Sequence, residues 1–387
     1  MNHELRSTFD KWKEELPNRY LPPHVVNEII NKNSYSHEII GTSFENRPIY
    51  KLNMGSGPVK LLFWSQMHGN ESTATRAMFD LWKIMHTDRF KFEKILNSVE
   101  IHFIPQLNPD GAHYYKRRNA ANIDINRDFN ASQTPEMIAL KKLVHLENYE
   151  FLFNMHDQRT IFHPEGSEKP ASLSFLAPVV DNLGTNPINR QKSIELISCM
   201  LEDLQPYLPN QLSRFSDEFY PNATGDNFQR LGFSTILIEC GHFPGDYKRN
   251  ETRKYTCLAI LKALESITSK QISQHNSTIY SETPINDQKS FDIIYYGVEI
   301  SNTHKVVVVD LGIQFEEILE QDENEISFVA KIMEIGDLTN YFGHDIYHAE
   351  NRVFENGTIF HPIIGQRANF KLGEWNIENG KPTNRAL

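Results

Sequence analysis

A short apolar strand that leads through a polar turn directly into a helix is the feature that most constrains this chain. The apolar run Val59–Trp64, interrupted by one lysine, precedes a turn that carries His68 and Glu71. From Ser72 to Thr87, apolar residues recur at helical spacing, which predicts a helix with one buried face. Open α/β sheets bind their ligands beyond the carboxyl ends of the strands. We therefore expect the imidazole and the carboxylate to point toward a common ligand.

The same alternation of strand and helix continues along the chain. Further strands are predicted at 99–104, 151–155, 172–177 and 234–238, and helices at 135–148, 187–204 and 250–269. Residues 37–54 resemble two short strands, and a long polar loop is expected from 105 to about 134. Strands that alternate with helices imply an α/β fold with a mixed, mostly parallel sheet between helical layers.

Changes in composition suggest where the chain divides. Residues 1–35 are expected to form an N-terminal helical extension, 36–270 the main α/β domain, and 271–289 a linker rich in polar residues. Residues 290–387 are predicted to be a small β-rich domain with an acidic turn at 316–325. Its predicted strands are 291–298, 305–311, 326–333 and 368–372.

Charge and cysteine content restrict the classes of function. The net charge of −11 and the pI of about 5.8 argue against a nucleic-acid or anionic membrane partner. The three cysteines are widely spaced and indicate reduced thiols. The amino-terminal residues contain no apolar signal segment, and no run of 18 apolar residues suggests a membrane span. We therefore predict a cytoplasmic protein.

Ionisable residues stand at the ends of three predicted strands. His68 and Glu71 follow the first, His156 the second and Glu239 the third. One histidine among 16 would more often be an ordinary polar side chain, but charged groups next to apolar strands are costly unless paired or coordinated. Two histidines and one glutamate are a common ligand set of catalytic zinc, with water in the fourth position. Glu239 would then lie near the metal and accept a proton from that water.

Motifs in the polar loop strengthen this interpretation. They are Asn108-Pro-Asp-Gly, Lys116-Arg-Arg and Asp124-Ile-Asn-Arg-Asp-Phe. Taken separately, the first could be a tight turn and the second a solvated basic run. Together with the His68-Gly-Asn-Glu71 turn and the residues at the strand ends, they resemble the zinc carboxypeptidase family typified by carboxypeptidase A. The resemblance covers residues 35–268.

The resemblance implies a role for each motif residue. It implies that one zinc ion is held by His68, Glu71 and His156, and that Glu239 is the general base and acid. It also implies that Asp124 orients His68 and that Arg117 polarises the scissile carbonyl, with Arg118 as the fallback. A substrate carboxylate would be held by Asn126 and Arg127, and Tyr220 would close over the substrate. Asp157 and Arg159 could contact substrate or be structural.

These implications define three alternative functions. The first is a zinc metallocarboxypeptidase acting on peptides, with 36–270 as the catalytic domain. The second is a related zinc amidohydrolase that acts on N-acyl amino acids or on cell-wall peptides, because the same carboxylate grip serves both substrates. The third is an inactive binding module, against which the joint presence of the metal ligands, Arg117 and Glu239 argues. Side-chain preference and oligomeric state are left open.

Overall fold

The computed structural model describes residues 9, 11, 13–270, 272, 278–320 and 325–383. The chain forms two compact units. The first consists of Met1–Gln158, Pro164–Gly166 and Ala171–Asn286, and the second of Arg159–His163, Ser167–Pro170 and Asp287–Leu387.

An eight-stranded mixed sheet forms the centre of the first unit, in the order β1-β2-β4-β3-β5-β9-β7-β8. Its central strands β4, β3, β5 and β9 run parallel, and β7 runs antiparallel to β9. The strands are β1 (His37–Thr42), β2 (Pro48–Gly55), β3 (Val59–Trp64), β4 (Val99–Ile104), β5 (Tyr149–Asp157), β7 (Leu173–Leu176), β8 (Leu212–Arg214) and β9 (Ser234–Cys240). This arrangement confirms the predicted fold class.

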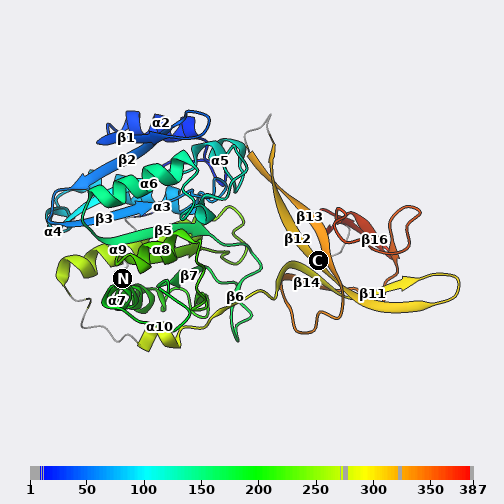
Figure 1. Ribbon diagram of the computed structural model, residues 1–387. Helices are drawn as coiled ribbons and strands as arrows, with labels where there is room; N and C mark the ends of the chain where they lie inside the picture. Colours follow the sequence, from blue (N-terminus) through cyan, green and yellow to red (C-terminus); the bar gives the residue numbers. More distant parts are fainter. Residues whose placement is uncertain are drawn as a thin grey trace. The chain divides into compact units, whose positions relative to one another are not determined.

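Helices cover both faces of this sheet (Figure 1). They are α2 (Pro23–Lys32), α3 (Thr73–Thr87), α4 (Glu93–Ser98), α5 (Pro109–Tyr114), α6 (Pro135–Leu146), α7 (Ile188–Leu204), α8 (Thr224–Arg230), α9 (Asn250–Ser269) and α10 (Thr278–Glu282). Apolar residues of α3, α7 and α9 form one core with the sheet, while α6 and α8 contribute to a second core on the other face.

The alternation of side chains along β3 explains the two cores. Leu61 and Phe63 belong to the core beneath α3, whereas Leu62 and Trp64 belong to the core beneath α6. Successive residues of a strand point to opposite faces, so an almost continuous apolar run is what a strand covered on both sides requires. The strand therefore ends where polar residues begin. The turn that contains His68 consequently lies at the carboxyl edge of the sheet.

The polar loop is more structured than its composition predicted. Asn108-Pro-Asp-Gly begins helix α5, because the Asn108 side-chain oxygen accepts a hydrogen bond from the Gly111 N–H at 2.8 Å. A 3₁₀ turn, η1 (Ile125–Arg127), follows, with Asp124 as its cap. The long-loop prediction was wrong here, since short helices held by polar caps carry little apolar periodicity.

The second unit contains two four-stranded sheets, β13-β12-β11-β14 and β15-β16-β17-β18. The strands are β11 (Ser290–Ser301), β12 (Val306–Glu320), β13 (Glu325–Gly336), β14 (Phe342–His348), β15 (Phe354–Glu355), β16 (Phe370–Leu372), β17 (Trp375–Glu378) and β18 (Lys381–Pro382). The predicted acidic turn at 316–325 was too wide, because β12 continues to Glu320. Its acidic residues lie in the ladder with β13, where Glu316 forms an ion pair with Lys331.

Of the predicted linker 271–289, residues 271 and 273–277 lie outside the described residues, and the remainder contains helix α10 and strand β10 (Asn286–Asp287). Short strands β6 (His163–Pro164) and β10 lie where the chain passes between the units, and α10 contributes buried Tyr280 to the first core. In the described part of the chain, no helix has the length and apolar character to cross a membrane. All three cysteines are buried free thiols. The cytoplasmic location and the domain boundaries stay predictions.

Candidate metal centre

Three parallel strands bring the predicted ligands to the same edge of the sheet. His68 and Glu71 lie in the turn between β3 and α3, and His156 is the penultimate residue of β5. Glu239 on β9 stands directly opposite His156 in the ladder. The carboxyl ends of parallel strands share one edge, which explains why residues so distant in sequence meet here.

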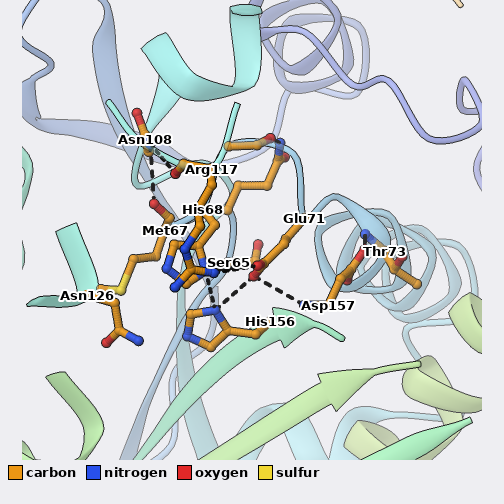
Figure 2. A network of polar contacts seen from close by, with 12 residues as sticks. Ser65, Met67, His68, Glu71, Thr73, Asn108, Arg117, Asn126, His156 and Asp157 are labelled. Atoms are coloured by element: carbon orange, nitrogen blue, oxygen red, sulfur yellow. Dashed lines mark hydrogen bonds and ion pairs between the residues drawn. The ribbon is translucent and has the colours of Figure 1, made fainter. Parts of the chain in front are cut away.

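The side chains of His68, Glu71 and His156 converge on one point (Figure 2). The Nδ1 atoms of the two imidazoles lie 3.1 Å apart, and each lies 2.8–2.9 Å from a different Glu71 oxygen. All three residues are buried. Ligands bonded to a tetrahedral zinc ion at 2.0–2.1 Å would be separated by about 3.3 Å. The spacing and chemistry of these atoms therefore fit a zinc ion.

The ionisation of these groups also suits a cation. Burial raises the pKa of Glu71, but the two imidazoles outweigh burial and hold it well below its usual range. Burial lowers the pKa of His156 and favours its neutral form. For His68, burial is outweighed by Glu71 and Asp124, which raise its pKa. Carboxylate and neutral imidazole are the forms that bind metal, and binding would displace any proton from His68.

A close backbone approach fixes the turn that carries the first two ligands. A Cβ atom on Gly69 would lie 1.9 Å from the carbonyl carbon of Gly111, so no larger residue fits without displacement. The Asn108 amide donates to the Met67 carbonyl at 3.3 Å and to the Arg117 carbonyl at 3.4 Å (Figure 2). The Asn108 motif therefore joins the ligand turn to the segment that carries Arg117.

Asp124 and Arg117 form the polar surroundings of His68. His68 Nε2 donates to Asp124 at 3.2 Å, which leaves Nδ1 facing the other ligands. The Arg117 guanidinium donates to Asp124 at 3.0 and 3.1 Å, and its Nη1 lies 3.2 Å from His68 Nδ1. The Arg117 side chain is 46% exposed, so a substrate can reach it. Arg118 instead contacts the Asn122 carbonyl and is exposed.

Glu239 lies in an environment unfavourable to a negative charge. Its pKa is raised well above the usual value, first by burial and then by Glu71 and Asp157, against the opposing effect of Arg117. The Asp157 carboxylate accepts bonds from Arg19 at 3.1 Å and from the Thr73 hydroxyl at 2.6 Å. Asp157 thus ties the start of α3 to the N-terminal segment, a structural role that the sequence left open.

Of the residues expected to hold a substrate carboxylate, Asn126 adjoins this cluster, because its backbone N–H donates to Asp124 at 3.0 Å. The Asn126 oxygen accepts the Thr224 N–H at 3.1 Å. Arg127 is exposed, and its guanidinium lies 5.9 Å from the centre of the Tyr220 ring. Tyr220 is 46% exposed and its hydroxyl donates to Glu218. The structure therefore brings Arg127 and Tyr220 together, whereas Figure 2 shows Asn126 outside the ligand group.

Two buried polar residues near these groups were not singled out from the sequence. Asn154 is fully buried, and neither polar atom of its side chain has a hydrogen-bond partner in the described chain. Asn154 lies two residues before His156 and therefore on the same face of β5. The alternation of side chains along a strand would have allowed this position to be predicted from the sequence. Asp226 on α8 is also buried, and it accepts the Tyr220 N–H at 3.0 Å. No sequence motif indicated Asp226.

Asp226 provides a pH-dependent test of this part of the structure. Burial raises its pKa from 3.8 to about 6. Above pH 6 the charged Asp226 carboxylate destabilises the folded state, because it is buried. As the pH falls from about 6 to 4, the folded state takes up a proton more readily than the unfolded state, and this destabilisation disappears. Asp226→Asn, which keeps an acceptor oxygen, should therefore gain about 2–3 kcal/mol of stability over the parent at pH 7 but little at pH 4.

Urea unfolding of both proteins at the two pH values measures this difference. An advantage of equal size at pH 4 and pH 7 would contradict the assignment of a raised pKa to Asp226.

The fold and the three converging side chains together define a candidate metal site at the carboxyl edge of a mixed α/β sheet. Residues 30–158 match the family model described as zinc carboxypeptidase. The chain is 27% identical over 153 residues to carboxypeptidase M of Mus musculus, covering 33% of this chain and 34% of that protein. It is 30% identical over 100 residues to carboxypeptidase SOL1 of Arabidopsis thaliana, covering 23% and 20%. The chain thus aligns with about a third or less of the length of these relatives.

Solved structures agree in fold. The metallo-carboxypeptidase from Burkholderia cenocepacia superimposes with a TM-score of 0.51 at 17% identity, over 64% of this chain and 69% of that one. Bovine thrombin-activatable fibrinolysis inhibitor, solved with a tick carboxypeptidase inhibitor, gives 0.50 at 15% identity, over 66% and 98%. Residues 30–158 are thus similar in sequence to zinc carboxypeptidases, and the solved structures share the fold.

Proposed function

We propose that this chain is a zinc-dependent carboxypeptidase that removes the C-terminal residue of peptides. One observation carries the proposal: His68, Glu71 and His156 converge as a zinc-type ligand set, with Glu239 on the neighbouring strand. The match of residues 30–158 to the zinc carboxypeptidase family model supports the same reaction. When bound, zinc would polarise the scissile carbonyl and lower the pKa of water from 15.7 to about 7.

In this proposal Glu239 moves the proton. It takes a proton from the attacking water and later gives one to the leaving amine. Its raised pKa supports this role, because a general base works best when its pKa approaches the operating pH. A neighbouring cation would lower that pKa and favour the carboxylate at the start of the reaction.

We assign to Arg117 the stabilisation of the negative charge that develops on the carbonyl oxygen. Its guanidinium reaches His68 Nδ1 and yet is about half exposed, so it can face a bound substrate. Asp124 holds both Arg117 and the His68 ring, which fixes the imidazole tautomer as the outer partners of metal ligands commonly do.

We assign to Arg127 the binding of the terminal carboxylate of the substrate. Asn126 and Tyr220 are assigned supporting contacts to the same part of the substrate. The exposed guanidinium next to an aromatic ring supports this assignment, since arginine pairs with carboxylates in a bidentate geometry. The Asn126 side-chain oxygen accepts the Thr224 N–H, so in this assignment its amide nitrogen donates to the substrate. Tyr220 would then cover the bound residue.

Removal of the arginine tests the carboxylate grip. Arg127→Ala should raise KM for peptides with a free C-terminus by about 10–100-fold, since a charge-assisted hydrogen bond contributes roughly 1.5–3 kcal/mol. The kcat should change less. Steady-state kinetics on one peptide and on its C-terminal amide measure the effect. An equal loss on both substrates would mean that Arg127 contacts something other than the carboxylate.

The proposed reaction itself is tested by identification of products. The zinc-loaded protein is incubated with a peptide mixture, with the C-terminally amidated peptides and with N-acyl amino acids, and the products are identified by mass spectrometry. Stepwise loss of C-terminal residues from the free peptides alone supports a carboxypeptidase. Release of amino acids from N-acyl amino acids alone would replace it by the amidohydrolase. No product from any substrate by metal-loaded protein would favour the binding module.

A further inference from the structure

A cavity in the first unit, separate from the metal centre, is lined by charged residues of both signs. It has a volume of about 400 Å³ and lies among α7, β8 and α10, of which α7 and α10 pack side by side (Figure 1). Arg190, Glu195, Arg214, Asp217 and Tyr280 contribute to its wall. None of these residues is assigned a part in the proposed hydrolysis. A cavity of this size accommodates a small metabolite.

Arg214 is incompletely satisfied within this wall. Its guanidinium stacks over the Tyr280 ring at 5.6 Å, and its Nη1 makes one long bond, 3.4 Å, to the Phe215 carbonyl. Its Nε is buried, and the described residues offer that atom no acceptor. A buried donor without a partner costs about 1–3 kcal/mol, more when it is charged. The guanidinium as a whole is only partly buried, so a ligand oxygen in the cavity can reach its terminal nitrogens, although not the buried Nε.

Arg190, by contrast, is held firmly by the protein. Its Nε donates to the Ala177 carbonyl at 3.1 Å, and its Nη2 pairs with Asp217 at 2.8 Å. Asp217 is therefore largely neutralised by Arg190. The remaining charges on the wall are one positive group, Arg214, and one negative group, Glu195, for which no cation of the described chain lies within ion-pair distance.

We propose that this cavity binds a free α-amino acid. Its carboxylate would accept from Arg214, and its ammonium group would face Glu195. A simple anion would meet Glu195 and a simple cation would meet Arg214, whereas a zwitterion complements both. Tyr280 provides an aromatic ring on this wall, and Asn186 and Gln191 also line it.

The inference does not depend on the proposed hydrolysis, but a product amino acid could also occupy the Arg127 site. The test therefore compares two variants by isothermal titration calorimetry with L-leucine, L-arginine and L-glutamate. Binding in the cavity should persist in Arg127→Ala and weaken at least tenfold in Arg214→Gln. Arg89→Gln, which removes an exposed arginine outside the cavity, should bind like the parent.

Analogues test the need for both charges. The N-acetyl derivative and the C-terminal amide of the bound amino acid should each bind at least tenfold more weakly. If Arg214→Gln does not fold, as judged by thermal unfolding, Glu195→Gln tests the ammonium contact and should weaken binding similarly. The inference is overturned if none of the three amino acids binds at concentrations up to roughly 10 mM, which is ten times the upper end of common substrate levels. It is also overturned if Arg127→Ala alone abolishes binding, or if inorganic phosphate binds and the amino acids do not.

Discussion

Glu239→Gln should retain the metal and lose turnover by about 10²–10⁴-fold, the range over which a general acid–base group contributes. Glutamine has nearly the same shape as glutamate and therefore preserves packing on β9, but it cannot accept the proton. The environment of Glu239 makes this loss specific. Burial, Glu71 and Asp157 all raise the pKa of its carboxyl group, so its proton affinity is tuned in a way that glutamine cannot reproduce. The value of kcat on a peptide substrate measures the effect.

Metal content and thermal unfolding are the controls for this variant. Metal content should match the parent, because the ligand atoms belong to His68, Glu71 and His156, and the unfolding temperature should not fall below that of the parent. A variant that binds zinc, folds normally and turns over near the parent rate would show that another group carries the proton.

Arg117→Ala should lower kcat by about 10²–10³-fold, the usual cost of removing one donor to a developing oxyanion. KM should change less, because the proposed interaction strengthens as charge develops on the carbonyl oxygen. Arg117 also holds Asp124, so the metal content of the variant must be measured alongside its rate. A loss of rate that simply follows a loss of zinc would indicate a positioning role.

The neighbouring arginine provides a matched control. Arg118 carries the same charge one residue further on but is exposed and contacts only the Asn122 carbonyl among the described residues. Arg118→Ala should therefore keep kcat within about twofold of the parent, as surface substitutions usually do. If Arg118→Ala loses as much activity as Arg117→Ala, the assignment of the arginine shifts by one residue.

The central part of the fold could be predicted because its elements have strong apolar patterns. The strands Val59–Trp64 and Val99–Ile104 and the helix Asn250–Ser269 have the predicted bounds. Helix α5 was missed because it is short and its start depends on a polar cap, Asn108. The length of β12 was underestimated because charged residues on a strand resemble a turn when their cross-strand partners, here Lys331, are unknown.

The part of the candidate site that lies at the ends of strands could be predicted from the sequence. Ionisable residues at the carboxyl ends of parallel strands must meet, so His156 could be expected near His68 without a structure. The positions of Arg19 and Asp226 depend on how distant segments pack, and periodicity does not contain that information. The roles given to Glu239, Arg117, Asn126, Arg127 and Tyr220 stay proposals.

The most direct measurement combines metal removal with a peptidase assay. The protein is stripped with a chelator, its zinc content is measured, and hydrolysis of a peptide is followed before and after addition of one equivalent of zinc. We expect activity to disappear with the metal and to return in proportion to bound zinc, with one ion per chain at full rate. His156→Ala should fail to recover. Hydrolysis that persists after complete removal of the metal would contradict the proposed function.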